Sequence, residues 1–230
     1  MSNSPSSVSL PFSGKYDRAH ALNYFRKHQD GLFRRLSNWR DMQIARRALA
    51  IAGQPELVLD LPCGAGRFWP VLAEHPARVI IGADNSADML AVARSMQAPG
   101  IVERVQTMQT SAFAIDLPDA SVDSVFCMRL IHHIGETEHR QQMLREMHRV
   151  TRDSVILSMW VDGNLKAWRR RQLETQRLRK GKSGYQNRFV IPADVAEAEF
   201  RSCGLDVVAR LDFLPRYAMW RTYVLRKAAA

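Results

Sequence analysis

The sequence predicts an α/β fold: a mostly parallel sheet that carries helices on both faces and ends in an antiparallel hairpin. Short apolar runs alternate with longer segments of helical periodicity, which is typical of parallel strands joined by covering helices. Two extended runs near the carboxyl terminus flank a turn and predict the hairpin. The expected strands of the alternating region are residues 57–61, 78–83, 103–108, 122–127 and 154–160, and its helices are 65–75, 86–97 and 137–150.

The carboxyl-terminal part departs from this alternation. Pro192 can begin a helix that reaches about Cys203, and Gly204 can cap its end. Two extended runs, 205–213 and 217–226, then follow on either side of a Leu-Pro-Arg break. They predict an antiparallel hairpin at the end of an otherwise parallel sheet.

The chain of 230 residues is long enough for one well-cored domain, which we place at residues 15–230. Residues 1–14 are rich in Ser and Pro and are expected to be disordered. Within 15–52, apolar residues recur at mostly helical spacing and predict one or two amphipathic helices packed on the core. Residues 164–188 stand out as a basic insertion.

Charge is distributed unevenly along the chain, whose formal net charge is +10. Residues 164–188 contain nine basic residues and one acidic residue, whereas 51–163 contain nine basic and fourteen acidic residues. Two interpretations of the basic segment stay open. It is either a solvated basic helix or a surface that binds anions.

Several classes of protein are disfavoured by what the sequence lacks. No apolar run approaches the roughly 18 residues that span a bilayer, and Met1 to Gly14 has no signal-peptide core, so we expect a cytoplasmic protein. Cys63, Cys127 and Cys203 have no metal-ligand spacing. We expect them to be reduced and structural, and we expect no metal site.

The run from Val58 to Arg67 joins an apolar strand to a glycine turn through Asp60. Such turns let a ligand approach the backbone and usually hold a nucleotide. The dinucleotide pattern GxGxxG is incomplete, because Trp69 stands at its third glycine. A carboxylate at Asp60 would repel a pyrophosphate but attract S-adenosylmethionine, which carries an ammonium and a sulfonium.

A second acid, Asp84, ends the next apolar strand, one helix length after the glycine turn, and is placed to bind both ribose hydroxyls. Together these residues resemble the class I S-adenosylmethionine-dependent methyltransferases, of the Rossmann-like type that includes the ubiquinone and menaquinone biosynthesis enzymes. The resemblance covers roughly residues 55–160. It implies a seven-stranded sheet, S-adenosyl-L-methionine as cofactor and S-adenosyl-L-homocysteine as product.

Further along, Thr110 to Phe113 and Leu117 to Asp123 are similar to the family's adenine-binding passage, and Val125 to Ile134 is similar to its exit from strand four. Two positions depart from the family. Pro62 replaces a glycine and removes a backbone donor, and Ser111 replaces an Asp that commonly holds the adenine amino group. The resemblance implies these cofactor-binding residues: Tyr16, Asp60, Pro62, Gly64, Gly66, Asp84, Asn85, Met89, Ser111, Ala112, Phe113 and Arg129.

Methyl transfer needs few catalytic groups, because the methyl carbon is already activated and positioning the acceptor supplies much of the rate. A hydroxyl or protonated amine must still lose a proton, and histidine titrates near neutral pH. His132 and His133 follow strand four and are the candidate bases; alternatively, one of them packs or caps the next helix. Arg129 could meet the cofactor's carboxylate, the acceptor or only solvent.

The resemblance also implies that residues 15–52 form a helical lid and that 164–188 recognise the acceptor. The first interpretation is a small-molecule, lipid-linked or phosphorylated acceptor methylated on O or N. The second is RNA, with Trp39, Trp168 and Tyr185 stacking on bases. The third is a non-catalytic binding protein that docks on an anionic membrane through the insertion.

Two nucleic-acid chemistries are disfavoured by the residues themselves. Methylation of an exocyclic base nitrogen usually uses a (D/N/S)PP(Y/F/W) motif after strand four, and Cys127-Met128-Arg129-Leu130 stands there instead. Methylation of cytosine C5 needs a nucleophilic cysteine, but Cys63 belongs to the cofactor turn. We therefore expect Cys63 to be structural.

Overall fold

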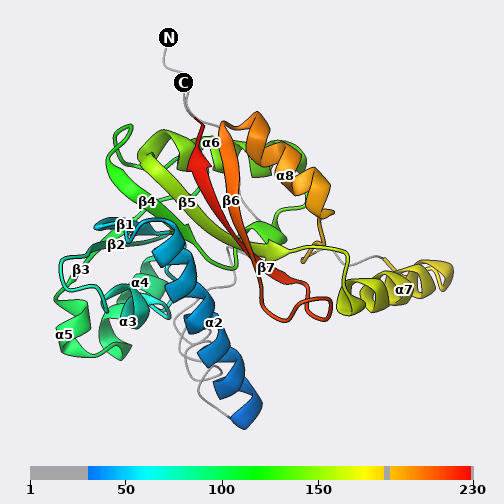
Figure 1. Ribbon diagram of the computed structural model, residues 1–230. Coiled ribbons are helices and arrows are strands. Elements are labelled where there is room, and N and C mark those ends of the chain that lie inside the picture. The colour runs from blue at the N-terminus through cyan, green and yellow to red at the C-terminus, as the bar shows by residue number, and fades with distance from the viewer. Residues whose placement is uncertain (1–30, 184–186, 229–230) are drawn as a thin grey trace.

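The computed structural model describes residues 31–183 and 187–228, which form one twisted sheet covered by helices (Figure 1). Its strand order is β3-β2-β1-β4-β5-β7-β6. Strands β1 to β5 are mutually parallel, and β7 runs antiparallel to both β5 and β6. The strands are β1 Leu57–Asp60, β2 Val79–Asp84, β3 Val105–Gln109, β4 Val122–Cys127, β5 Thr151–Trp160, β6 Leu205–Asp212 and β7 Trp220–Lys227. The predicted α/β sheet with a terminal hairpin is confirmed.

Helices cover both faces of this sheet, as Figure 1 shows. One apolar cluster packs α6 and α8 on one face, and a second packs α2, α3 and α4 on the other. The helices are α2 Leu32–Ile51, α3 Trp69–Leu72, α4 Ala87–Met96, α5 Pro99–Val102, η2 Ile131–His133, α6 Thr137–Val150, α7 Leu165–Arg179 and α8 Ala193–Ser202. Among the residues described, no helix is long and apolar enough to cross a membrane.

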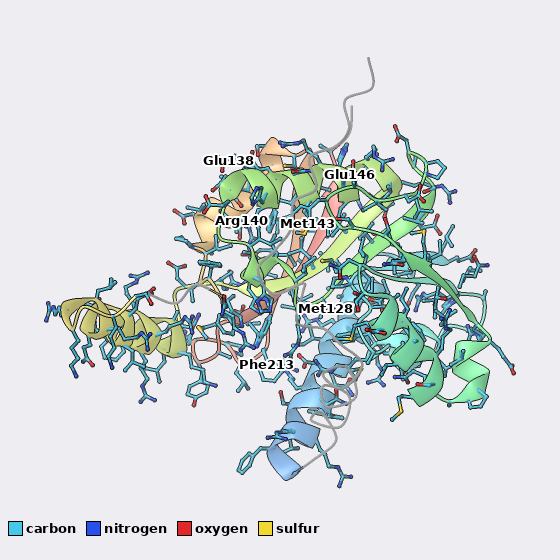
Figure 2. All side chains as sticks on the ribbon, turned by 180° about the vertical axis from the view of Figure 1, so that it is seen from behind. Met128, Glu138, Arg140, Met143, Glu146 and Phe213 are labelled. Atoms are coloured by element: carbon cyan, nitrogen blue, oxygen red, sulfur yellow. The ribbon has the colours of Figure 1, made fainter. Side chains whose placement is uncertain are left out.

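The two helices of the first face are also tied by a buried ion pair. Arg140 on α6, labelled in Figure 2, donates to both carboxylate oxygens of Glu199 on α8 at 2.9 and 2.6 Å. Arg140 also donates to the backbone carbonyls of Ile134 and Gly135. A bidentate pair with these additional acceptors satisfies a guanidinium that would otherwise be costly to bury. It fixes α6 and α8 against the segment that follows η2.

The prediction of a helix over 65–75 is wrong in its extent, because the only α-helical residues there are 69–72. A longer helix would need the N–H of residue 70 to bond to the carbonyl of Gly66, and Pro70 has no N–H. Residues 64–68 form turns instead. The short helix α5 was not predicted, and β5 begins at Thr151 rather than at residue 154.

Because β1 to β5 are parallel, their carboxyl ends meet at one edge of the sheet. That edge carries Asp60, Asp84, Cys127 and Trp160 as the last residues of β1, β2, β4 and β5. The strand order reverses between β1 and β4, and ligands of open α/β sheets bind outside the carboxyl ends at such a reversal. The topology therefore places the candidate site over β1 and β4.

Candidate active site

The two acids at the strand ends have opposite surroundings. Asp84 is held by the backbone: its Oδ2 accepts from the N–H of Gly64 at 3.0 Å and its Oδ1 from that of Ser86 at 3.0 Å. Asp60 is fully buried, and its carboxylate oxygens have no charged partner and no backbone donor among the residues described; burial raises its pKa more than the nearby Trp69 indole lowers it. Burial raises the pKa of both carboxyls, and the charge of Asp84 raises the pKa of Asp60 further.

A buried carboxyl without a partner is unfavourable in the protein alone, because ionising it in a dry environment is costly. A cation beside Asp60 would offset that cost and return its pKa towards the usual range. An ammonium group fits this requirement, and a pyrophosphate does not. The surroundings of Asp60 therefore fit a cofactor that carries a positive charge.

The glycine turn positions these acids through its left-handed backbone. Gly64 and Gly66 have φ values of 54° and 70°, which side-chain-bearing residues rarely adopt. A Cβ on Gly66 would lie 2.8 Å from the Trp69 ring, and a Cβ on Gly82 would lie 2.7 Å from it. The two glycines thus make room for the fully buried Trp69 indole, which occupies the place where the dinucleotide pattern has its third glycine.

Two backbone N–H groups of this turn, which the sequence analysis expected to face a ligand, already make hydrogen bonds within the protein. The Gly64 N–H is already bonded to Asp84, and the Gly66 N–H donates to the Cys63 carbonyl at 3.0 Å. Pro62 follows a cis peptide bond and offers no donor. The donor at Gly64 therefore orients the Asp84 carboxylate.

The three cysteines are buried free thiols. Burial, followed by the charges of Asp60 and Asp84, raises the pKa of Cys63 well above its usual range. A thiol that resists ionisation is a poor nucleophile. This agrees with the structural role expected for Cys63.

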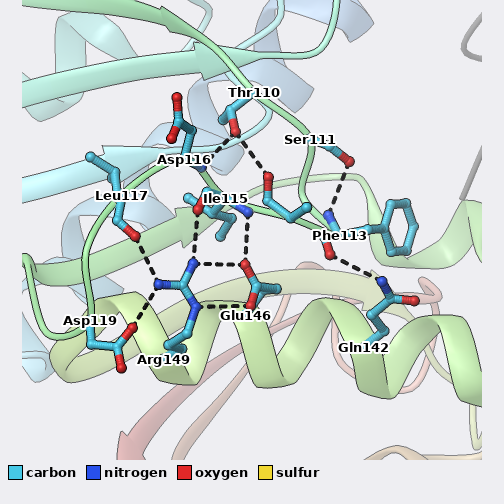
Figure 3. Close-up of polar contacts among 11 residues, drawn as sticks. Thr110, Ser111, Phe113, Ile115, Asp116, Leu117, Asp119, Gln142, Glu146 and Arg149 are labelled. Atoms are coloured by element: carbon cyan, nitrogen blue, oxygen red, sulfur yellow. Dashed lines mark hydrogen bonds and ion pairs between the residues drawn. The ribbon is translucent and has the colours of Figure 1, made fainter. Parts of the chain in front are cut away.

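Residues 110–119, which include the predicted adenine-binding positions, are fastened to α6 (Figure 3). Glu146 accepts from the Ile115 N–H at 2.8 Å, and Arg149 donates to the carbonyls of Ile115 and Leu117 at 2.8 Å each. Gln142 donates to the Phe113 carbonyl at 3.1 Å. The helix therefore sets the position of this loop.

Within this loop, the Ser111 hydroxyl accepts from the Phe113 N–H at 3.2 Å, so one of its acceptor sites is used locally. Ala112 and Phe113 are buried. Asn85, in the turn between β2 and α4, is exposed, and Met89 of α4 is buried, with its N–H bonded to the capping Ser86 hydroxyl. These predicted cofactor positions surround the end of β2. Tyr16 lies outside the described residues.

Arg129, directly after β4, does not project freely. Its φ is 64°, its N–H donates to the Ser158 hydroxyl at 2.8 Å, and its guanidinium pairs with Asp41 of α2. The same guanidinium lies over the Trp220 ring at 4.5 Å. Asp41 also pairs with Arg67 of the glycine loop at 2.5 Å. One carboxylate thus links the cofactor turn to the end of β4.

The two histidines differ in their surroundings. His132 is buried among aromatic rings, with centroids 4.0 Å from His133, 5.0 Å from Trp160 and 4.7 Å from Trp220. Burial, and then the neighbouring positive charges, lower its pKa to about 2. His133 is partly exposed, and its Nδ1 lies 2.6 Å from the Asn187 carbonyl oxygen. A carbonyl only accepts, so this contact places the ring's proton on Nδ1 when His133 is neutral.

The basic insertion forms α7, which projects from the body of the protein (Figures 1 and 2). Its basic side chains lie all around the helix axis, and Trp168 is 58% exposed. Trp39 on α2 is also 58% exposed. Tyr185, the third predicted stacking residue, lies outside the described residues.

Three residues of this edge escaped the sequence analysis: Asp41, Trp160 and Trp220. A signal existed for Asp41, because it is the single acid in the basic helix α2. Trp160 and Trp220 are brought together by the pairing of β5 with β7, in which they are direct partners. Sequence spacing does not reveal this pairing.

Comparisons with known proteins agree with this geometry. Residues 58–154 match the model of a family described as a methyltransferase domain. An uncharacterised methyltransferase-like protein of Schizosaccharomyces pombe is 33% identical over 93 residues, which are 40% of this chain and 34% of that protein. The methyltransferase GfsG of Streptomyces halstedii is 32% identical over 96 residues, 41% of this chain and 34% of GfsG. The match therefore covers about a third of these relatives.

Among solved structures, the magnesium protoporphyrin IX methyltransferase of Synechocystis PCC 6803 with bound S-adenosylhomocysteine has a TM-score of 0.70 at 15% identity, over 93% of this chain and 97% of that one. The [4+2]-cyclase SpnF has a TM-score of 0.61 at 16% identity, over 82% and 83% of the two chains. Both likenesses concern the fold, and the cyclase illustrates that one fold hosts different reactions.

The strand order, the acidic strand ends and the methyltransferase-domain match over residues 58–154 agree with the class I S-adenosylmethionine-dependent methyltransferases. The family resemblance drawn from the sequence is thereby confirmed, and so is its Rossmann-like sheet.

Proposed function

We propose that this protein transfers a methyl group from S-adenosyl-L-methionine to an O or N atom of a small-molecule, lipid-linked or phosphorylated acceptor. The observation that carries the proposal is the pair of acids at the ends of β1 and β2. One acid, Asp60, is buried without a charged partner or a backbone donor among the described residues, and the other, Asp84, is held in place by two backbone N–H groups. Such a pair suits a ligand with a cation at one end and hydroxyls at the other.

Three parts of the edge would hold the cofactor. Asp60 would face its ammonium group, and Asp84 would accept hydrogen bonds from its ribose hydroxyls through the lone pairs that Gly64 and Ser86 leave available. Ser111, Ala112 and Phe113 would contact the adenine. When bound, the cofactor supplies a methyl group on a sulfonium, and the protein's remaining task is to align the acceptor.

We assign proton removal, where the acceptor requires it, to His133 rather than His132. The pKa of His132 is lowered to about 2, so it accepts a proton only weakly. His133 is partly exposed, and its bond to Asn187 leaves Nε2 as the basic nitrogen of the neutral ring. Burial also lowers the pKa of His133. We assign His132 to packing among the aromatic rings, the role that the alternative interpretation gives to one of the two histidines.

The test combines cofactor binding with acceptor discovery. Calorimetry should show that the wild-type protein binds S-adenosylmethionine and that Asp60→Asn binds it more weakly. Tritiated methyl donor should then be incubated with the protein and a cell extract separated into RNA, lipid and small-molecule fractions. Label in the lipid or small-molecule fraction supports the proposal. Absence of cofactor binding would instead favour the non-catalytic binding protein.

A second candidate, RNA methylation, is favoured by one observation: α7 projects from the body and is basic around its whole circumference. The tRNA (carboxymethyluridine(34)-5-O)-methyltransferase ALKBH8 of Mus musculus is also 24% identical over 128 residues, 54% of this chain and 18% of ALKBH8. Label in the RNA fraction, with an affinity for RNA that falls steeply as salt rises, would select this candidate.

A further inference from the structure

The sheet edge that carries the two acids also carries a second group of side chains, formed by four aromatic rings and three arginines. The rings belong to His132, His133, Trp160 and Trp220, which contact one another directly. Trp160 ends β5 and Trp220 begins β7, so the cluster sits at the same sheet edge as Asp60. It occupies the β4, β5 and β7 side, beyond the point where the strand order reverses.

Three guanidinium groups converge on this cluster from different parts of the chain. Arg170 of α7 lies 5.1 Å and Arg188 lies 5.8 Å from the Trp160 ring centre, and Arg129 lies 4.5 Å from that of Trp220. After burial and His133, the charges of Arg188, Arg129 and Arg170 lower the pKa of His132, in that order. Three positive charges from separate parts of the chain therefore converge on this cluster.

The segment that carries Arg188 is fixed to the histidines. The Phe189 N–H donates to the His132 carbonyl at 2.7 Å, and the Asn187 carbonyl lies 2.6 Å from Nδ1 of His133. Arg170 donates to the Arg188 carbonyl at 2.8 Å, which ties α7 to the same segment. These contacts preorganise Arg170 and Arg188 on one side of the cluster.

Two polar atoms in the cluster are buried and lack partners. Nε1 of Trp160 and Nδ1 of His132 make no hydrogen bond to any described residue, and their side chains belong to residues 7% and 3% exposed. Buried indole N–H groups usually find an acceptor. An acidic oxygen of a bound molecule would supply one for Trp160, next to the two arginines.

We propose that this constellation binds the methyl acceptor and that the acceptor is a small planar aromatic molecule bearing a carboxylate or a phosphate. Its anionic group pairs with Arg170 and Arg188. Its aromatic body packs against the partly exposed Trp220 and His133. This inference rests on the proposed function, because it gives the same site a substrate class.

The geometry favours a small acid over RNA. The aromatic rings lie together at the sheet edge that carries Asp60, whereas α7 projects away from the sheet (Figure 1). A guanidinium that stacks on tryptophan is also well suited to bidentate binding of a carboxylate or phosphate. Binding of RNA in place of the small acid is therefore one of the outcomes that the experiment distinguishes.

The test uses the full chain saturated with S-adenosylhomocysteine, so that no turnover occurs. Calorimetry would measure binding of 2-naphthoate, 2-naphthyl phosphate, neutral 2-naphthylmethanol, decanoate and a short single-stranded RNA. We expect one or both of the naphthyl anions to bind more tightly than the alcohol and decanoate. The stronger of the two anions identifies carboxylate or phosphate as the preferred group.

The matched variants are Arg170→Gln/Arg188→Gln and, as the control on the same helix, Arg179→Gln. The double variant should weaken binding of the naphthyl anion about tenfold or more, since it removes charge-assisted hydrogen bonds. The control should stay near the wild type. Neither variant should change affinity for S-adenosylhomocysteine, which reports that the fold and the cofactor half are intact.

Three results would overturn the inference and leave the proposed function unaffected. The naphthyl anions could fail to bind the complex with S-adenosylhomocysteine, or the double variant could bind them as tightly as the wild type. Decanoate could also bind as tightly as the aromatic acids. RNA bound in place of the naphthyl anions would overturn the inference in favour of the second candidate. If S-adenosylhomocysteine itself fails to bind the wild type, the proposed function fails, and the inference falls with it.

Discussion

The two halves of the sheet edge are built in different ways. The β1–β3 half is acidic, and backbone N–H groups and short local turns hold its functional groups. The β4–β5–β7 half is aromatic and cationic, and its side chains come from η2, β5, β7, α7 and the loops that carry Arg129 and Arg188. The first half suits a ligand of fixed structure, and the second suits a ligand that differs between related proteins. Asp41 joins the halves by pairing with Arg67 on one side and Arg129 on the other.

The largest effect should come from the cofactor half. Asp84→Ala removes two acceptor oxygens for the ribose, and hydrogen bonds to a charged group contribute about 1.5–3 kcal/mol each. We expect affinity for S-adenosylmethionine to fall by about a hundredfold or more, measured by calorimetry. Asp88→Ala, an exposed acid on the first turn of α4, is the control and should bind like the wild type. Undiminished binding by Asp84→Ala would contradict the assignment.

The second-largest effect is expected at Asp41, which links the two halves of the sheet edge. Asp41→Asn leaves Arg67 and Arg129 without their shared carboxylate, in surroundings where Asp41 is 6% exposed. The free energy of unfolding should fall by about 2 kcal/mol, because mostly buried cations lose their partner. Chemical denaturation measures this loss.

The control for that variant is an exposed pair on the same helix. Arg46 of α2 pairs with Glu74 at 2.6 Å, with both side chains more than 40% exposed. Glu74→Gln should cost less than about 1 kcal/mol. Equal losses for Asp41→Asn and Glu74→Gln would mean that Asp41 is an ordinary surface charge.

Asp60→Asn should act in opposite directions on binding and stability. Affinity for S-adenosylmethionine should fall about tenfold, since the ammonium loses its counter-charge. The cofactor-free protein should become more stable near neutral pH. The folded-state pKa of Asp60 is raised, so the wild type loses stability as pH rises from the unfolded pKa of about 3.9 towards the folded one.

Thermal unfolding against pH checks this sign. The gain in melting temperature of Asp60→Asn over the wild type should be larger at neutral pH than at about pH 3, where Asp60 is largely protonated in both states. A gain that is constant with pH, or larger in acid, would show that Asp60 is paired in the protein.

The smallest effect is expected on α7. Replacing Arg169, Arg170 and Arg171 by Gln should raise the KM for the acceptor identified by fractionation about threefold to tenfold, because anion binding is weakened. Cofactor affinity should stay unchanged, since none of the three contacts the acids at β1 and β2. Arg179→Gln/Lys180→Gln, at the far end of α7, is the matched control. An unchanged KM would remove α7 from acceptor recognition.

The same contrast explains what the sequence could predict. Asp60, Asp84 and the glycine turn follow one another within 25 residues, so local patterns identified them together with the strands. Arg129 lies two residues after β4, and its partners Asp41 and Trp220 depend on helix packing and on strand pairing, which sequence spacing does not show. The helix over 65–75 was overextended because Pro70 was not weighed against the apolar spacing. Distant contacts leave no local pattern.

The most direct test of the central claim is a calorimetric titration of S-adenosylmethionine into the wild type and Asp60→Asn at mildly acidic pH, in buffers with different ionisation enthalpies. If a buried, protonated Asp60 receives the cofactor's cation, wild-type binding releases a proton, and Asp60→Asn binding does not. Equal affinity and equal proton release in both proteins would contradict the account.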